Sequence, residues 1–395
     1  MTACPVCAAG APAISVTRDR LPSMQNYVHR TPQQARAVAR GQLLLATCQS
    51  CGFSWNTSFD PARLAYDAGY DNAVPSAVMD RHYHDTAREL GHRHSLAGGY
   101  VVDVGCGNGA FLKTLCAVWP ECRALGVDPA LPCDEVLADG RLRLIKGVFA
   151  PHQLERPPSL IVSRHVLEHM PDPVAFVGEL RAASDAGGGA PVFVEVPDLD
   201  WILDHQAFWD FCYEHCNYFT SATLRALLAR AALRVTNAGV TFGRQYQWIE
   251  AVPSPASDPS RSIGAALAAR LREYAHGEHG RVEAIRSRLD ELRRRGRTVA
   301  VWGMATKGIM FSLMVDPDSR LIDYTVDMNV NKQGCYVPIS GRRIDSPAVL
   351  RPWAGSPAVV VVMNPNYVQE IASTCRGLGV AASFMDASGG ELIAA

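Results

Sequence analysis

A run of glycines after an apolar segment is the feature of this sequence best suited to binding chemistry. Val101–Val104 is apolar apart from Asp103, and Gly105, Gly107 and Gly109 follow it. Glycines at this spacing let the backbone approach a ligand closely, and the start of a following helix favours negative charge. The pattern predicts a strand, a turn and a helix that together hold a nucleotide-bearing cofactor.

The glycine turn alone leaves two classes of cofactor open. It also satisfies a relaxed dinucleotide fingerprint, and Asp128 stands after the next apolar segment, where NAD enzymes too place a carboxylate for ribose hydroxyls. Asp103, two residues before the first glycine, gives the D-x-G-x-G-x-G form seen in class I methyltransferases. The stretch 163–173, S-R-H-V-L-E-H-M-P-D-P, resembles the segment after the fourth strand of such enzymes. We therefore predict S-adenosylmethionine.

The residues predicted to contact this cofactor lie in the glycine turn, after the following strands and in the H-V-L-E-H stretch. They are Asp103, Gly105, Cys106, Gly107, Asn108, Asp128, Pro129, Phe149, Arg164, His165, Glu168 and His169. Phe149 is assigned to packing on adenine, with a core position as the alternative. Because His165 and His169 are four residues apart, they would share a helix face, and a metal pair is their second interpretation.

Two cysteine pairs near the N-terminus form the second chemical feature. Each has the C-x-x-C spacing, Cys4 with Cys7 and Cys48 with Cys51. Four thiolates can surround zinc tetrahedrally, and such a closed shell leaves no position for a substrate. Gly52 suits the tight turn of a zinc knuckle. The pairs predict a structural zinc site, with buried or redox-active thiols as the alternative.

The elements that must position these residues follow from the apolar pattern. Strand-like and helix-like segments alternate in the middle of the chain, which predicts a doubly wound α/β sheet. The predicted strands are Tyr100–Val104, Ala124–Val127, Leu160–Ser163 and Pro191–Val196, and the predicted helices include Gly109–Val118 and Pro173–Ala183.

The last third of the chain predicts a second Rossmann-like unit. The Pro- and Ser-rich stretch 252–260 is typical of a linker, and residues 262–295 of a long amphipathic helix. A strand from Arg297 and buried strands at Ile322–Asp327 and Ala358–Met363 follow. We therefore expect three domains: a zinc-binding domain over 1–80, a cofactor-binding α/β domain over 81–255 and a substrate-binding domain over 256–395.

Charge and hydropathy exclude several partners. The 38 basic and 39 acidic residues give a net charge of −1, which is unlike the basic field that nucleic acid requires. The basic run 293–297 ends the long helix, where cations suit the helix dipole, and a phosphate contact is the alternative. Without an apolar run of membrane-spanning length or a signal-peptide pattern, a cytoplasmic protein is expected.

Taken in order, the motifs resemble the zinc-containing sugar C-methyltransferases, which act on nucleotide-linked keto-deoxysugars in antibiotic biosynthesis. The resemblance rests on the cysteine pairs, D-V-G-C-G-N-G-A-F, R-H-V-L-E-H, E-V-P, Y-E-H-x-x-Y-F-T and the second α/β unit. In that unit, W-G-M-A-T-K-G from Trp302 and M-N-P-N-Y from Met363 carry the likeness. It spans nearly the whole chain and implies a monomer that binds S-adenosylmethionine and zinc.

The resemblance also implies the catalytic residues. Glu214 and His215 match the family's Glu-His pair, in which the histidine is the general base. A histidine can take a proton from a carbon next to a ketone at cellular pH, and the enolate carbon then attacks the sulfonium methyl group. A capping or surface pair that merely leads into a helix, with Thr220 or Ser221 as the cap, is the alternative interpretation.

Two tyrosines complete the predicted catalytic set. The family carries a tyrosine two residues before the glutamate, whereas this chain has Cys212 there and Tyr213 next to the glutamate. A second tyrosine comes from the N-terminal segment, where Tyr70 is preferred and Tyr66 is next. The catalytic prediction is therefore Tyr213 and Tyr70 beside the Glu-His pair.

Other functions stay open at this point. A histidine base serves an alcohol as well, so O- or N-methylation of a sugar or small metabolite is the main alternative. An NAD oxidoreductase and a non-enzymatic zinc-ribbon module are the others. Lys307 is either a phosphate contact or an exposed lysine at a helix start, and Gln245, Tyr246 and Asn366 are plausible pocket members.

Overall fold

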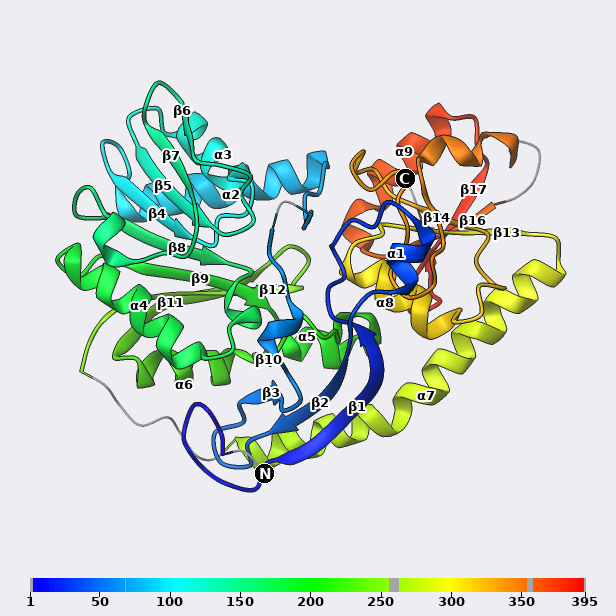
Figure 1. The fold of residues 1–395 in the computed structure, drawn as a ribbon, viewed down its shortest axis with the longest axis horizontal. Coiled ribbons are helices and arrows are strands. Elements are labelled where there is room, and N and C mark those ends of the chain that lie inside the picture. Colours follow the sequence, from blue (N-terminus) through cyan, green and yellow to red (C-terminus); the bar gives the residue numbers. More distant parts are fainter. Residues whose placement is uncertain (1–2, 68, 256–262, 354–357, 394–395) are drawn as a thin grey trace.

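The computed structural model describes residues 3–67, 69–255, 263–353 and 358–393, which form three sheets joined by helices (Figure 1). The N-terminal sheet is antiparallel in the order β1-β2-β3-β10. Its elements are β1 (Ala13–Pro22), α1 (Pro32–Arg36), β2 (Arg40–Thr47), β3 (Ser54–Asn56) and β10 (Asn217–Tyr218). Strand β10 lies far along the chain, begins two residues after His215, and pairs with β3. The predicted catalytic segment is therefore attached to the N-terminal sheet.

The central sheet is doubly wound, as predicted. Its order is β11-β12-β9-β8-β4-β5-β7-β6, and the five strands from β9 to β7 run parallel. The strands are β4 (Tyr100–Val104), β5 (Arg123–Asp128), β6 (Glu135–Leu137), β7 (Leu142–Lys146), β8 (Leu160–Arg164), β9 (Val192–Pro197), β11 (Leu233–Thr241) and β12 (Tyr246–Pro253). The helices are α2 (Ala77–His94), α3 (Ala110–Val118), α4 (Pro173–Ala186), α5 (Leu199–Asp204) and α6 (Ser221–Arg230).

Alternate residues of the central strands serve two cores. Val101 packs with the cluster under α2 and α3, whereas Val102 packs with the cluster under α4 and α6. Successive side chains of a strand point to opposite faces, so a strand covered by helices on both sides is apolar throughout. This is why the local pattern predicted β4, β5, β8 and β9 to within two residues.

The C-terminal sheet is a second parallel unit with one antiparallel edge strand. Its order is β15-β14-β13-β16-β17-β18. The elements are α7 (Gly264–Arg294), β13 (Thr298–Trp302), α8 (Thr306–Val315), β14 (Tyr324–Val326), β15 (Ile344–Asp345), β16 (Ala358–Val362), α9 (Val368–Gly377), β17 (Ala382–Asp386) and β18 (Glu391–Leu392). Helix α7, the predicted amphipathic helix, runs from beside the N-terminal sheet to this unit (Figure 1). Within the described ranges, no helix is long and apolar enough to cross a membrane.

Two sequence expectations need adjustment here. The strand predicted from Ile322 begins only at Tyr324, because the carboxylate of Asp316 accepts the backbone N–H groups of Arg320, Leu321 and Ile322. Of the predicted linker, residues 252 and 253 belong to β12, and residues 256–260 lie outside the described residues.

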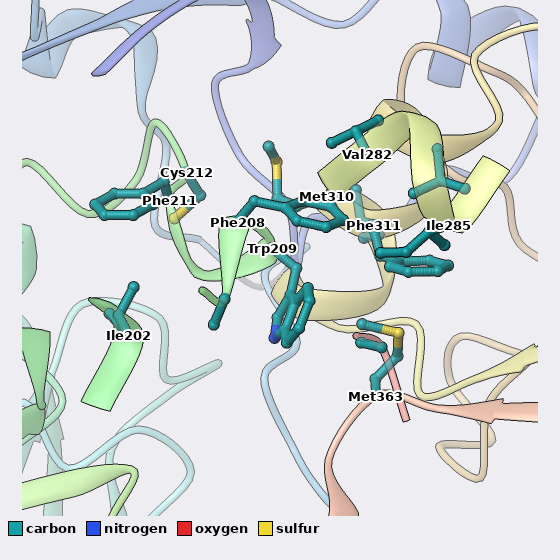
Figure 2. Close-up of a cluster of buried hydrophobic side chains, with 14 of the residues drawn as sticks. Ile202, Phe208, Trp209, Phe211, Cys212, Val282, Ile285, Met310, Phe311 and Met363 are labelled. Carbon is teal, nitrogen blue, oxygen red and sulfur yellow. The ribbon is translucent and has the colours of Figure 1, made fainter. Parts of the chain in front are cut away.

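One apolar core joins the N-terminal sheet, α7 and the C-terminal unit around a buried loop, residues 208–216, which lies between α5 and β10. Figure 2 shows Phe208 and Trp209 of this loop beside Met310 and Phe311 of α8. The rings of Phe208 and Phe311 stack with centroids 6.0 Å apart. The loop that leads to Glu214 and His215 is thereby held between the two α/β units.

A buried arginine fixes the polar backbone of the same loop. Arg18 of β1 donates to the carbonyl oxygens of Phe208 (2.8 Å) and Phe211 (2.7 Å). Its guanidinium also binds Glu278 of α7, with Nε 3.1 Å from the carboxylate. Buried carbonyl groups and charges are costly unless they are paired, so Arg18 satisfies the loop and α7 together.

A pair of helical glycines tests the close packing of α2 on α3. A Cβ at Gly91 would lie 2.0 Å from the Trp119 ring, whereas one at the exposed Gly280 meets nothing within 4 Å in the described part of the chain. We expect Gly91→Ala to lower the free energy of unfolding by about 1–3 kcal/mol through overpacking. Gly280→Ala should raise it by about 0.5–1 kcal/mol through helix propensity. Denaturant unfolding measures both, and equal stabilisation by the two variants would contradict this packing.

Candidate active site

The carboxyl ends of the central and C-terminal sheets meet at one cavity of about 320 Å³. Strand-end residues of both sheets line it: Arg164 and Pro197 from the central sheet, and Trp302, Asp327 and Met363 from the C-terminal sheet. In open α/β sheets, ligands bind outside the carboxyl ends of the strands, where the strand order reverses. Two such edges face this single space.

The glycine turn lies next to the cavity, at the end of β4. Gly105, Gly107 and Gly109 all have positive φ angles, of 80°, 56° and 75°. A Cβ at Gly105 would lie 2.3 Å from Val166, so a larger residue does not fit there. At Gly107 the nearest described atom to such a Cβ is Oδ1 of Asn72, at 4.0 Å, and Asn72 lines the cavity. The turn is therefore open on the side where a ligand would approach.

Two carboxylates flank this opening. Asp128 binds the turn itself, since its Oδ2 accepts the N–H of Gly107 at 2.8 Å. Asp103 is 3% exposed, and its Oδ1 has no hydrogen-bond partner among the described residues. Burial raises the pKa of Asp103 to about 7, against the opposing charge of Arg164. An unpartnered acid beside an open turn fits S-adenosylmethionine, whose ammonium group Asp103 would hold while Asp128 would hold its ribose.

The other residues predicted to contact the cofactor occupy different environments around the turn. Phe149 is 5% exposed and packs in the core beneath α4, so the core alternative describes its position. Cys106 is buried, and Pro129 is exposed. Asn108 is exposed and accepts the N–H of Ala110 at 3.1 Å, at the start of α3.

The H-V-L-E-H stretch does not form the helix face that its spacing suggested. His165 has a left-handed φ of 56°, and only Leu167–His169 forms a single 3₁₀ turn. The expectation that His165 and His169 share a helix face is therefore wrong. Both nevertheless line the cavity, together with Glu168.

His165 lies between two buried carboxylates. Its Nδ1 is 3.5 Å from Glu168 and its Nε2 is 3.2 Å from Glu195. Burial alone would lower its pKa, but the two carboxylates raise the pKa of His165 to about 9. The ring is thus an imidazolium at neutral pH. Glu195, which also binds Arg164 at 2.7 Å, was missed by sequence reasoning, although a lone acid inside the apolar strand V-F-V-E-V is a signal for it.

Glu214 is a buried carboxylate that three parts of the chain share. It is 1% exposed, its Oε1 accepts the backbone N–H of Gln25, and its Oε2 accepts the hydroxyl of Tyr70 at 3.1 Å. Burial raises the pKa of Glu214. Tyr70 and Glu214 both line the cavity, so the structure brings this predicted pair together.

His215 faces His169 across the cavity wall, with ring centroids 4.9 Å apart. Burial, followed by the nearby His169, lowers the pKa of His215 to about 3. His169 places its Nδ1 3.0 Å from the carbonyl oxygen of Glu214 and 3.1 Å from the hydroxyl of Tyr66. Because a carbonyl only accepts, the Nδ1 of His169 carries a hydrogen. His215 is thus a neutral imidazole, and His169 presents its Nε2 as an acceptor when neutral.

Tyr213 lies outside the cavity lining. Its side chain is fully buried against Gly41 and Phe59, and its hydroxyl accepts the N–H of Asp60 at 2.8 Å. The structure therefore does not bring Tyr213 to Glu214 and His215 on the cavity surface. The cap of α6 is Thr220, so Glu214 and His215 do not cap that helix.

The C-terminal side of the cavity carries two lysines. Lys307 pairs with Asp210 at 2.8 Å and donates to Gln245 at 3.1 Å, so the interpretation of it as an exposed lysine is wrong. Lys332 is buried and donates to Oδ1 of Asn26 at 2.9 Å. Sequence reasoning missed Asn26 and Lys332 as site residues because their contact spans most of the chain.

Of the three other residues predicted to line a pocket, two line the cavity and one does not. Gln245 and Tyr246 line the cavity, and the Tyr246 ring contacts His165 with centroids 4.4 Å apart. Asn366 lies in a neighbouring groove and donates to the carbonyl oxygen of Phe242. The basic run at the end of α7 binds acids of its surroundings, as in the pair between Arg293 and Asp323, which agrees with the interpretation of a helix end.

The two cysteine pairs converge. Sγ of Cys4 lies 3.7 Å from that of Cys51, Sγ of Cys7 lies 3.5 Å from that of Cys48, and all four lie within 4.8 Å of one another. A tetrahedron of sulfurs around zinc has edges of about 3.8 Å, so the four thiols fit that ion. Gly52 has a φ of 79°, which confirms the predicted tight turn.

Comparison with known families defines the class of the two α/β units. Residues 79–238 match a family model described as a methyltransferase domain. Residues 261–390 match one described as a C-methyltransferase C-terminal domain. The glycine turn thus belongs to a class I methyltransferase domain of the S-adenosylmethionine-dependent type, and the second α/β unit is similar to a domain found in C-methyltransferases.

Two relatives found by sequence agree with this class. The chain is 30% identical to the C-methyltransferase NovU of Streptomyces niveus over 277 residues, 63% of each protein. It is 32% identical to a trans-aconitate 2-methyltransferase of Methylobacterium nodulans over 33% of this chain and 51% of that protein. The matches thus span less than two thirds of either relative. The solved magnesium protoporphyrin IX methyltransferase of Synechocystis is 17% identical, with 47% of this chain and 91% of that one aligned at a TM-score of 0.35.

The raised pKa of Asp103 makes a prediction for stability. Since the folded-state pKa of about 7 exceeds the ordinary value of 3.8, the cofactor-free fold loses stability as pH rises between these values. Asparagine does not ionise, so Asp103→Asn removes this loss. The free energy of unfolding of the variant, relative to that of wild type, should therefore rise by about 1–4 kcal/mol between pH 5 and pH 8. Urea unfolding at both pH values measures it, with the exposed Asp318→Asn as control. Parallel pH curves for Asp103→Asn and wild type would contradict the prediction.

Proposed function

We propose that this protein is an S-adenosylmethionine-dependent methyltransferase that methylates a carbon next to the ketone of a nucleotide-linked deoxysugar, with His215 as general base. One observation carries the proposal. The imidazole of His215 lines a cavity that the methyltransferase domain shares with the C-terminal α/β unit, beside the glycine turn.

The comparisons support carbon as the methylated atom. The second α/β unit matches a domain described for C-methyltransferases, and the relative NovU is named a C-methyltransferase. The wall that this unit contributes includes the ammonium groups of Lys307 and Lys332. Such groups suit the phosphates of a nucleotide-linked sugar.

The chemistry follows from the residues around the base. The bound cofactor supplies an electrophilic methyl group. His215 takes the proton from the carbon next to the ketone, and the electrons of the broken C–H bond pass to the carbonyl oxygen. The imidazolium of His165 lies on the same cavity and can stabilise the negative oxygen. The enolate carbon is then held for in-line attack.

Glu214 and its partners position the base. Glu214 is bonded to Gln25 and Tyr70, so the residue next to His215 is fixed to the N-terminal segment. Strand β10 fixes the other side through its pairing with β3. Strand β3 in turn begins at Ser54, three residues after Cys51 of the cysteine cluster. We infer that the four thiols hold a structural zinc ion, whose role is to stabilise this support.

Substitution of His215 tests the base. We expect His215→Asn to lower turnover by about 10²–10⁴-fold, because it removes the proton acceptor, while affinity for S-adenosylmethionine stays unchanged. The exposed His152→Asn should keep wild-type turnover. Unchanged turnover in His215→Asn would contradict the proposal. With a ¹³C-labelled methyl donor, the carbon shift of the product separates C-methylation from the alternative O- or N-methylation.

Substitution of a cysteine tests the zinc site. Cys48→Ser should lower the zinc content from about one ion per chain and reduce the melting temperature, because a structural zinc contributes folding free energy. The exposed Cys133→Ser should change neither. Full zinc content and unchanged melting of Cys48→Ser would exclude a Cys4 site.

A further inference from the structure

One acidic and one basic side chain beside His215, Glu168 and His169, take no proton from the substrate in the mechanism described above. Glu168 and His169 each offer a ligand atom within 4.8 Å of one another and of His215. All three residues line the cavity. Glu168 is 2% exposed, and its Oε2 has no hydrogen-bond partner in the ranges that the structure describes.

The donor set has a defined chemistry. Two imidazoles and one carboxylate bind borderline divalent transition cations and leave further positions for solvent or substrate. A buried oxygen without a partner is costly, and a bound cation would satisfy it. Oε1 of Glu168 faces His165 at 3.5 Å, so Oε2 is the oxygen left for a ligand.

Neighbouring groups also orient His169, the second of the three ligand residues. Nδ1 of His169 donates to the carbonyl oxygen of Glu214 at 3.0 Å, and Tyr66 lies 3.1 Å from the same nitrogen. Metal-bound histidines typically donate their other N–H to a carbonyl or carboxylate in this way. The contact leaves Nε2 of His169 as the metal-binding atom.

We propose that Glu168, His169 and His215 form a second metal site, distinct from the four cysteines, which takes a divalent transition cation such as Zn²⁺ and inhibits methyl transfer. The cation binds the lone pair of His215 that would otherwise accept the substrate proton. Inhibition therefore rests on the proposed function, whereas binding of the cation does not.

Titration with Co²⁺ distinguishes binding at this site from binding at the four cysteines. Zinc binds more tightly than Co²⁺ at a given set of ligands, so the full chain is first loaded with about one Zn²⁺ at the thiols and then titrated with Co²⁺. We expect one further equivalent to bind with visible d–d absorption and no thiolate charge-transfer band. Methyl transfer should fall with the same midpoint. Binding of no further equivalent, or a spectrum with the thiolate band, would overturn the proposal.

Variants identify the ligands. Glu168→Gln and His169→Gln should each weaken Co²⁺ binding by more than about tenfold, since even the loss of a group that only hydrogen-bonds a metal ligand costs about 10–100-fold. His152→Asn, on the surface, should bind as wild type does. Zinc content and circular dichroism show whether each variant is folded. Co²⁺ binding that is unaffected in folded Glu168→Gln and His169→Gln would also overturn the site.

The two proposals can fail separately. If Co²⁺ binds and Glu168→Gln weakens it, but His215→Asn keeps full turnover, the metal site stands and the assignment of His215 as base is wrong. If His215→Asn loses turnover but no second equivalent of Co²⁺ binds, the base stands and the metal site is wrong.

Discussion

Glu214 has 1% of its surface exposed, and such a carboxylate is stable in a protein only when hydrogen bonds replace its water. Its two oxygens accept from Gln25 and Tyr70, which both lie in the N-terminal segment. The backbone carbonyl oxygen of Glu214 accepts from His169 of the methyltransferase domain, and the next residue on the chain is His215. One buried acid thus ties the position of the candidate base to two separate parts of the molecule.

The surrounding fold maintains this arrangement from several directions. Arg18 satisfies the carbonyl groups of the preceding loop, and β10 pairs the following residues with β3. The loop also packs against α8, so the C-terminal unit closes the cavity from the other side. A change in the cysteine cluster would therefore reach the cavity through β3 and β10 rather than by direct contact.

Local features of the sequence predicted much of this architecture. Continuous apolar runs predicted β4, β5, β8 and β9. The spacing of the glycines predicted the turn after β4, and these glycines have positive φ angles in the structure. Contacts between distant residues could not be predicted in the same way. The pairing of His165 with Glu195, the position of His169 beside His215 and the burial of Tyr213 depend on packing between elements. The helix expected over H-V-L-E-H was wrong because His165 adopts a left-handed φ that ends any helical run.

Proton exchange tests the central claim most directly, because it isolates the base from methyl transfer. With S-adenosylhomocysteine in place of the methyl donor, a nucleotide-linked keto-deoxysugar is incubated with the protein in D₂O and followed by proton NMR. The account predicts that wild type exchanges the proton next to the ketone and that His215→Asn exchanges it at least about 100-fold more slowly. Equal exchange by the two proteins would contradict the account.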